Sequence, residues 1–287
     1  MTIAIVLKIG DGLVFGADSA STLSNGNTFV NSYFNAEKVF NVVKGLPLGA
    51  VTAGLGGLAG RSVMSLAKDL RQKLCDPAQK DWFLDPESYT LEDAAQRIKQ
   101  FFFDDLYQTQ FATLDANAPR PAMFFLVGGY GAHQTRSEIW RVSVDQGGNF
   151  SVTCDGTRDN PWGISWQGMP EALNRLVRGY SSGVYNGLVK SGIPELEVQR
   201  FLGGIEVEPL IHDAMPLQDA IDLVHYLIEV TTGFVRFAPG VPMVHPPIDS
   251  AAITLHEGYR WIRRKHYFSR KLNRPIERYE VSRRTQQ

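Results

Sequence analysis

The pattern of apolar and polar positions predicts a β-hairpin at the start of the chain. Residues 2–7 form an uncharged run, Gly10-Asp11-Gly12 is a tight-turn signal, and residues 13–19 form a second apolar run. Two short runs joined by such a turn are typical of a hairpin, in which the second strand returns beside the first. We therefore expect Asp18, at the end of the second run, to lie close to Thr2, at the start of the first.

Apolar residues at helical and at strand spacing recur along the rest of the chain. Helices are predicted over residues 58–74, 90–106, 170–179 and 217–233, the second opening on a cap formed by Thr90 and Asp93. Strands are predicted before Gly54 and over residues 122–127, 138–145 and 248–255. This order suits two sheets packed face to face with helices outside them. We expect an α+β fold, a four-layer α/β/β/α sandwich, and another α+β fold is the alternative that the pattern leaves open.

Charge is distributed unevenly between the body of the chain and its last residues. The chain has 287 residues, 44% of them hydrophobic, which is enough for one globular domain with a sizeable core. Residues 260–287 carry ten Lys or Arg and two Glu, a net +8, so residues 1–259 carry −9 of the total −1. We expect a domain over 1–259 and a basic C-terminal extension over 260–287 that contacts an acidic surface on a neighbouring subunit.

Several partners and compartments are disfavoured by what the sequence contains. Aromatic residues interleave with the charges of the extension, but a docked protein arm needs them too, so nucleic acid is the less favoured partner. No apolar run has the length of a membrane span and no secretory signal opens the chain, which predicts a cytoplasmic protein without membrane contact. Cys75, Cys154 and the six scattered histidines lack metal-ligand spacing, so we expect no metal and no cofactor.

Thr2 is the first candidate for chemistry. A threonine hydroxyl is a weak nucleophile until a base lies beside it, and an N-terminal threonine carries such a base, its own α-amine, with an ordinary pKa of ~7.7–8.0. Removal of Met1 would expose both groups on one residue at the start of a strand. The plainer interpretation is that a small second residue only allows the initiator to be trimmed.

Three further features with candidate roles follow Thr2 along the sequence. Asp18 ends the second strand, Lys38 stands before the apolar Val39-Phe40, and Ala53-Gly54 ends another strand. Taken singly they are a turn former, a solvated lysine and a chain turn. Together with Ser19, Ser21 and Thr22, their order resembles that of the proteasome β-type subunits and their bacterial homologues, which are N-terminal nucleophile hydrolases.

The resemblance implies a role for each matching residue. Thr2 would be the nucleophile and, through its amine, the proton acceptor, while Lys38, held by Asp18, would supply positive charge near the hydroxyl. The backbone N–H of Gly54 would donate to the oxyanion of the tetrahedral intermediate. Thr22 would bind the backbone of an extended peptide. The pocket for the residue before the cut would be lined by small uncharged residues, namely Ser21, Ala36, Thr52 and Gly56.

The resemblance covers roughly the first 75 residues and is thin beyond them. Members of the family complete the network with a serine in a Gly-Ser-Gly type turn and with an Arg-Asp-x-x-Ser-Gly type loop. Here Ser165, within residues 162–169, is the nearest serine to the first, and residues 236–247 hold no acid for the second. His245 is a possible substitute donor. Either the chain has rebuilt this half of the site with other groups, or it is an inactive relative that keeps the fold.

The resulting hypothesis is a threonine-type peptidase acting on peptides or unfolded protein inside a self-compartmentalised homo-oligomeric ring. The apolar segment of residues 82–84 is expected at a subunit contact, and an unfoldase partner is left unspecified. Two alternatives remain from the sequence. One is an amidase of the same chemistry acting on a small substrate, and the other is a catalytically silent ring-forming or scaffold protein.

Overall fold

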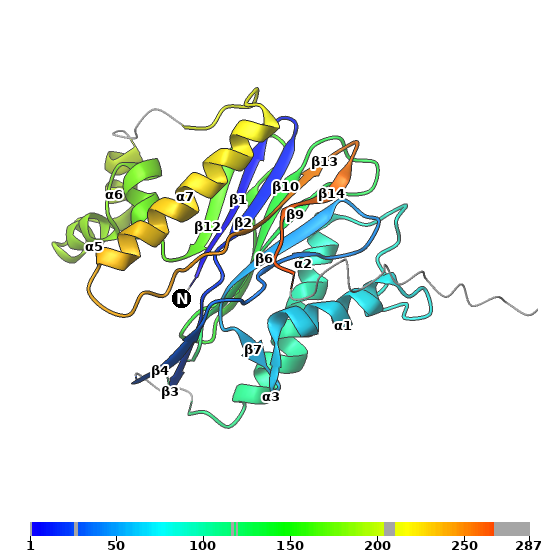
Figure 1. The fold of residues 1–287 in the computed structure, drawn as a ribbon, viewed down its shortest axis with the longest axis horizontal. Coiled ribbons are helices and arrows are strands. Elements are labelled where there is room, and N and C mark those ends of the chain that lie inside the picture. Colours follow the sequence, from blue (N-terminus) through cyan, green and yellow to red (C-terminus); the bar gives the residue numbers. More distant parts are fainter. Residues whose placement is uncertain (1, 26–27, 116–117, 119, 204–209, 267–287) are drawn as a thin grey trace, which may run out of the picture.

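The computed structural model describes residues 2–25, 28–115, 118, 120–203 and 210–266, and it contains two five-stranded antiparallel sheets (Figure 1). The first sheet has the order β12 (Gly163–Gly168), β1 (Ile3–Ile9), β2 (Gly12–Ala17), β13 (Asp249–Thr254) and β14 (Gly258–Arg263). The second has the order β11 (Phe150–Gly156), β10 (Glu138–Val144), β9 (Met123–Gly129), β6 (Leu48–Gly54) and β5 (Val39–Asn41). Two small hairpins extend from them: β3 (Ser21–Asn25) with β4 (Thr28–Tyr33), and β7 (Gly57–Leu58) with β8 (Arg61–Ser62).

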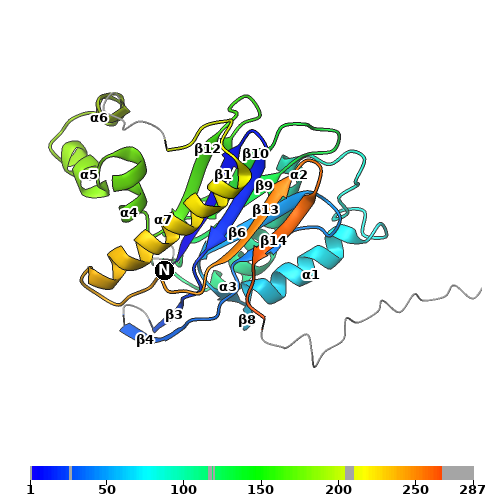
Figure 2. The same cartoon turned by 45° about the horizontal axis from the view of Figure 1, so that its top comes forward.

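Helices lie over the outer faces of both sheets. One group follows the β7–β8 hairpin: α1 (Val63–Cys75), α2 (Leu91–Lys99), the π-helix η1 (Gln100–Tyr107) and α3 (Gln108–Phe111). The other group follows β12: α4 (Glu171–Leu173), the π-helix η2 (Asn174–Arg178), α5 (Ser182–Lys190), α6 (Glu195–Gly203) and α7 (Leu217–Phe237). Figure 2 shows α7 running along the first sheet and α1 near the other end of the fold.

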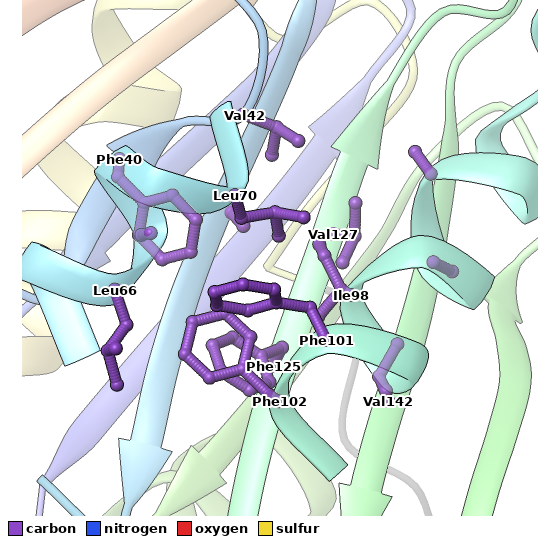
Figure 3. Packing of buried hydrophobic residues seen from close by; sticks show 14 of the residues in the cluster. Phe40, Val42, Leu66, Leu70, Ile98, Phe101, Phe102, Phe125, Val127 and Val142 are labelled. Atoms are coloured by element: carbon purple, nitrogen blue, oxygen red, sulfur yellow. The ribbon is translucent and has the colours of Figure 1, made fainter. Parts of the chain in front are cut away.

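Three apolar clusters hold these elements together. Ala4, Val6 and Phe15 of the first sheet pack with Val51 and Leu126 of the second between the two sheets. A second cluster fills the space between α7 and the other face of β1 and β2. The third lies between α1, α2, η1 and the second sheet. There, aromatic side chains pack around Phe125 of β9 (Figure 3). Alternate residues of β1 therefore face different cores, which explains its uninterrupted apolar sequence.

The predicted N-terminal hairpin is confirmed. β1 and β2 pair with Ala4 opposite Ala17, and the N–H of Asp18 donates to the carbonyl of Ile3 at 3.3 Å. On its other side β1 pairs with β12, which places Ile3 opposite Gly168. β12 was not predicted as a strand, because residues 163–168 show no clear alternation of apolar and polar side chains.

The predicted helices are present, with shifted ends. The first begins at Val63 and not at residue 58, because residues 57–62 form the β7–β8 hairpin and Ser62 caps the helix. The cap by Thr90 and Asp93 is confirmed, and that helix continues through the π-helix η1 into α3. The helix predicted over 170–179 is a short α4 followed by η2, and α7 continues to Phe237. β11, α5 and α6 were not predicted.

The structure bears on two expectations, the domain boundary at residue 260 and the role of residues 82–84. The proposed domain boundary at residue 260 falls inside β14, so the start of the basic extension is an edge strand of the first sheet, and residues 267–287 lie outside the described residues. Within residues 82–84, Leu84 is buried and Trp82 packs against the core of its own subunit. That segment therefore contributes to the core of its own subunit, and its place at a subunit contact stays a prediction.

Candidate active site

The carboxylate of Asp18 joins three separate parts of the chain. It follows β2, is buried, and accepts four hydrogen bonds, two on each oxygen. Oδ1 accepts from the N–H of Ile3 at 3.0 Å and from Nζ of Lys38 at 2.7 Å. Oδ2 accepts from the N–H groups of Ala20 at 2.8 Å and His245 at 3.1 Å. Both oxygens of this buried carboxylate are therefore satisfied by donors.

Lys38 stands just before β5 and is the charged partner of Asp18. Its side chain is 7% exposed and that of Asp18 is fully shielded. Burial lowers the pKa of Lys38 below its ordinary value, and the adjacent Asp18 carboxylate opposes this by favouring the ammonium. The carbonyl of Lys38 accepts from the N–H of Thr52 on β6, so the backbone on which the ammonium is carried is fixed to the second sheet.

Thr2 is buried and is fixed by the turn that follows β12. Its carbonyl accepts a hydrogen bond from the N–H of Met169 at 2.8 Å. Gly168 has φ +108, and a Cβ atom there would lie 1.8 Å from the carbonyl oxygen of Thr2. Only glycine permits this approach. Gly168 and Met169 are thus positioning residues that the sequence reasoning missed, although it had singled out residues 162–169 as the place to look.

Thr2 and Lys38 line one cavity of about 60 Å³. The same cavity is lined by the other residues predicted for the oxyanion and the substrate, namely Gly54, Ser21, Thr22, Ala36, Thr52 and Gly56. Gly54 ends β6 with φ +89, and a Cβ atom there would lie 2.3 Å from the carbonyl oxygen of Ala122. The structure therefore brings together residues that are up to 54 positions apart in the sequence.

Two larger cavities adjoin this one. The first, of about 970 Å³, shares Thr22, Gly54 and Gly56 with it and continues past Phe124 and Gly168. The second, of about 400 Å³, shares residues of β3 and of the segment before β5, and continues to α1. Together they extend the space beside the cavity of Thr2 enough for a chain longer than a single amino acid.

Ser165 is not brought to Thr2. It lies in β12 opposite Val6, three pairs along the strand from the Ile3–Gly168 pair, and its hydroxyl hydrogen-bonds the carboxyl group of Asp155. His245 does reach the site, but through its backbone N–H, which donates to Asp18. Its ring lies against Phe34, with ring centroids 4.2 Å apart.

A second lysine and aspartate pair lies beside the first, and sequence reasoning missed it. Nζ of Lys265 donates to Oγ of Ser19 at 2.5 Å and contacts the buried carboxylate of Asp249, at the start of β13. Lys265 lowers the pKa of Lys38 and Asp249 raises it, so the pairs act on each other. Asp249 lies two positions after residues 236–247, and its partner comes from the segment predicted to be a subunit-binding arm.

Comparison with known proteins shows a relative by fold. No family model matches the chain, and no curated protein matches it. Among solved structures, the Gly-1 mutant of Anbu from Hyphomicrobium sp. strain MC1 is similar, with a TM-score of 0.50 and 15% identity over 92% of this chain and 86% of that chain. The two proteins share a fold. At this identity the likeness shows the fold alone.

Two further features are absent from the described residues. Among them, no helix is both long and apolar enough to cross a bilayer. No group of three or more His, Cys, Asp or Glu side chains in the described part of the chain is arranged to hold a metal ion.

Proposed function

We propose that this chain is an N-terminal nucleophile hydrolase of the proteasome-like class, a threonine peptidase that uses Thr2. The observation that carries the proposal is the buried Lys38–Asp18 pair lining the same small cavity as Thr2 and Gly54. The fold supports the class, since the chain is similar to Anbu, a bacterial proteasome-like protein. We interpret the two sheets and their outer helices as the α/β/β/α sandwich of this class.

The proposed reaction requires a free amine on Thr2, exposed by removal of the residue before it. Oγ1 of Thr2 attacks the substrate carbonyl carbon while its proton passes to the amine. The C–N bond then breaks, the leaving peptide amine takes that proton, and an ester acyl-enzyme remains. Water, deprotonated by the same amine, attacks the ester and releases the second product. The N–H of Gly54 donates to the oxyanion in both halves.

In this proposal Lys38 acts as a fixed positive charge. An ammonium near the hydroxyl and the amine of Thr2 favours the alkoxide and the neutral amine, which are the reactive forms. The Asp18 carboxylate at 2.7 Å keeps the ammonium charged in spite of its burial. The four donors on Asp18 fix that carboxylate without a further side chain, which supports an active site in the absence of the family's later acid and serine.

The proposed substrate is a peptide or an unfolded protein segment, held as an extended strand. The two cavities that adjoin the cavity of Thr2 support an extended substrate, because a single amino acid amide would leave them largely empty. The cavity of about 60 Å³ accommodates the residue before the cut and favours a small apolar one. The lining is not wholly uncharged as predicted, since Glu37 also borders this cavity.

We further propose that the sites are enclosed in a homo-oligomeric ring. Large apolar side chains at the surface support a contact between copies, among them Leu196, 67% exposed, and Phe201, 65% exposed, on α6. The basic residues after His266 are the proposed charged part of that contact. An unfoldase partner is compatible with the proposal and is not specified by any described residue.

The test uses purified protein whose measured mass shows that Met1 has been removed and that Thr2 is the first residue. It should cleave fluorogenic peptides and be labelled on Thr2 by a boronate or an epoxyketone, whereas Thr2→Ala should do neither while keeping its thermal transition. Thr2→Ser, which retains a hydroxyl and an amine, is the matched control and should retain measurable activity. Full hydrolysis by Thr2→Ala would refute the proposal, and correctly processed wild type without activity would favour the silent scaffold.

A further inference from the structure

A separate cavity of about 420 Å³ lies at the far end of the fold from α7, between α1, the β5–β6 turn and the edge strand β14 (Figure 2). The turn contributes Lys44, helix α1 contributes Lys68 and Arg71, and β14 with the residues after it contributes Arg260 and Arg264. It shares no lining residue with the cavity of Thr2, and it shares Met64 and Lys68 with the cavity of about 400 Å³ that adjoins the latter. Its basic lining is not accounted for by the proposed peptidase reaction.

The charge of this cavity is strongly one-sided. Five of its lining residues are Lys or Arg, and Glu257 is the one acid among them. Within the described ranges, Lys44, Lys68 and Arg260 form no ion pair, and Arg264 is 3.9 Å from Glu37, a residue outside the cavity lining. Like charges held this close repel one another, and a bound anion would remove that repulsion.

Arg71 is held in a fixed orientation at the wall of the cavity. Its Nε donates to the carbonyl oxygen of Asn41 at 3.0 Å, and its Nη2 donates to the same oxygen. The amide of Asn41 donates in turn to the carbonyl of Leu48 at 3.0 Å. The remaining N–H groups of this guanidinium have no partner among the described residues. Burial lowers the pKa of Arg71. No carboxylate among the described residues forms an ion pair with this guanidinium.

Tyr259 provides a second, independent observation that points to a ligand. It lines the same cavity, and its hydroxyl is buried without a hydrogen-bond partner in the part of the chain that the structure describes. The charges of Arg71 and Arg264 both act on that hydroxyl. A buried hydroxyl without a partner costs about 1–3 kcal/mol, so native proteins rarely retain one without a use.

We propose that this cavity binds a compact, multiply charged phosphate compound, such as one carrying a di- or triphosphate group. Guanidinium groups match phosphate oxygens in pairs, and lysines add charge without a fixed geometry. With five cations against one acid, a single carboxylate would leave most of the positive charge uncompensated, whereas a polyphosphate would neutralise it. The volume lies within the ~300–1,000 Å³ typical of small-molecule sites.

Titration calorimetry with inorganic tripolyphosphate on the full chain tests the proposal without any peptidase activity. The double variant Lys44→Gln with Lys68→Gln should bind at least tenfold more weakly than wild type. The matched control, Lys80→Gln with Lys190→Gln, loses the same charge at exposed positions outside the cavity and should bind like wild type. Equal weakening in both double variants would show mere attraction to surface charge and overturn the proposal, as would the absence of binding to wild type.

Tyr259→Phe separates a built site from a charged surface. Loss of one hydrogen bond to a charged ligand is expected to weaken binding about tenfold. The melting temperature without ligand should stay the same or rise, because a buried hydroxyl without a partner is removed. An unchanged affinity of this variant for tripolyphosphate would overturn the proposed site. Citrate distinguishes the anion class, since citrate that binds as tightly as tripolyphosphate would contradict a preference for phosphate.

Discussion

Lys38 and Asp18 form an ion pair of 2.7 Å in which the two side chains are only 7% and 0% exposed. A pair this deeply buried is a poor device for stability, because the desolvation of both charges offsets most of their attraction. Asp18 would remain satisfied without the lysine, since three backbone N–H groups also donate to it. The pair is therefore better explained by a function of the ammonium at the cavity of Thr2 than by folding.

The first prediction concerns the charge of Lys38. Lys38→Met fills similar space without the ammonium and should reduce peptide hydrolysis by at least ~10²-fold, the scale of removing one member of a nucleophilic unit. The variant should still fold, because the backbone donors to Asp18 remain. Steady-state kinetics and a thermal melt measure the two effects. Activity within a few-fold of wild type, in a variant confirmed to be folded, would exclude an electrostatic role for this lysine.

The second prediction is the pH dependence of that role. Because burial lowers the pKa of Lys38 from its ordinary 10.5, the ammonium loses its proton at a lower pH than a solvated lysine does. The charge is present below that pKa and lost as the pH rises through it, so kcat should fall on the alkaline side before the pH reaches 10.5. In Lys38→Arg the guanidinium stays charged, and any residual activity should persist to higher pH. An identical alkaline limb in both proteins would assign it to another group.

The third prediction compares two glycines that share a positive φ. Gly54 has φ +89 and no room for a Cβ atom, whereas Gly60 has φ +71 and nothing within 4 Å. Gly60→Ala should cost about 1–2 kcal/mol of stability, from the left-handed conformation alone, and keep its activity. Gly54→Ala should be less stable than Gly60→Ala. Its kcat should fall at least ~10²-fold, because the oxyanion donor is displaced. Equal kcat in the two variants would argue against Gly54 as that donor.

The sequence was sufficient to predict a residue's position in the candidate site where its own strand fixes that position. It was insufficient where the position depends on pairing with distant strands. The hairpin pattern alone places Asp18 beside Thr2, whereas the strand end at Gly54 gained its role only from the resemblance to the proteasome β-type subunits. Ser165 was misplaced because its position depends on the register between β12 and β1, which the residues of β12 alone do not fix. Asp249 and Lys265 were missed because only the pairing of β13 with β14 and β2 brings them beside Ser19.

The fourth prediction concerns the residue before the cut. The cavity of about 60 Å³ is much smaller than the two that adjoin it, so alanine or valine should be preferred over phenylalanine. Thr52 and Gly56 set that size, and Gly56→Ala should narrow the choice further, since its Cβ would lie 3.1 Å from Oγ of Ser21. A peptide library read by mass spectrometry measures the preference. Dominant cleavage after Asp, Glu, Lys or Arg would contradict the assignment of this pocket.

The last prediction concerns the residues after His266. Residues 267–287 carry six Lys or Arg and two Glu, a net +4, while residues 1–266 carry −5. Truncation after His266 keeps β14 and the contact of Lys265 with Asp249, so the domain should fold as before. If the basic segment binds an acidic surface of a neighbouring copy, the truncated chain should sediment as smaller species at low salt. The full-length assembly should weaken with added salt, because the screening length falls to about 3 Å at 1 M.

A full-length variant in which Arg270, Lys271, Arg274 and Arg278 are all changed to Gln is the matched control for that truncation. It removes four positive charges and retains the length and the aromatic residues of the segment. If charge is the attraction, this variant should sediment like the truncated chain and be equally insensitive to salt. If it assembles like wild type while the truncated chain does not, the contact is made by the aromatic residues. An unchanged size distribution in both would mean that the segment takes no part in assembly and is available to a different acidic partner.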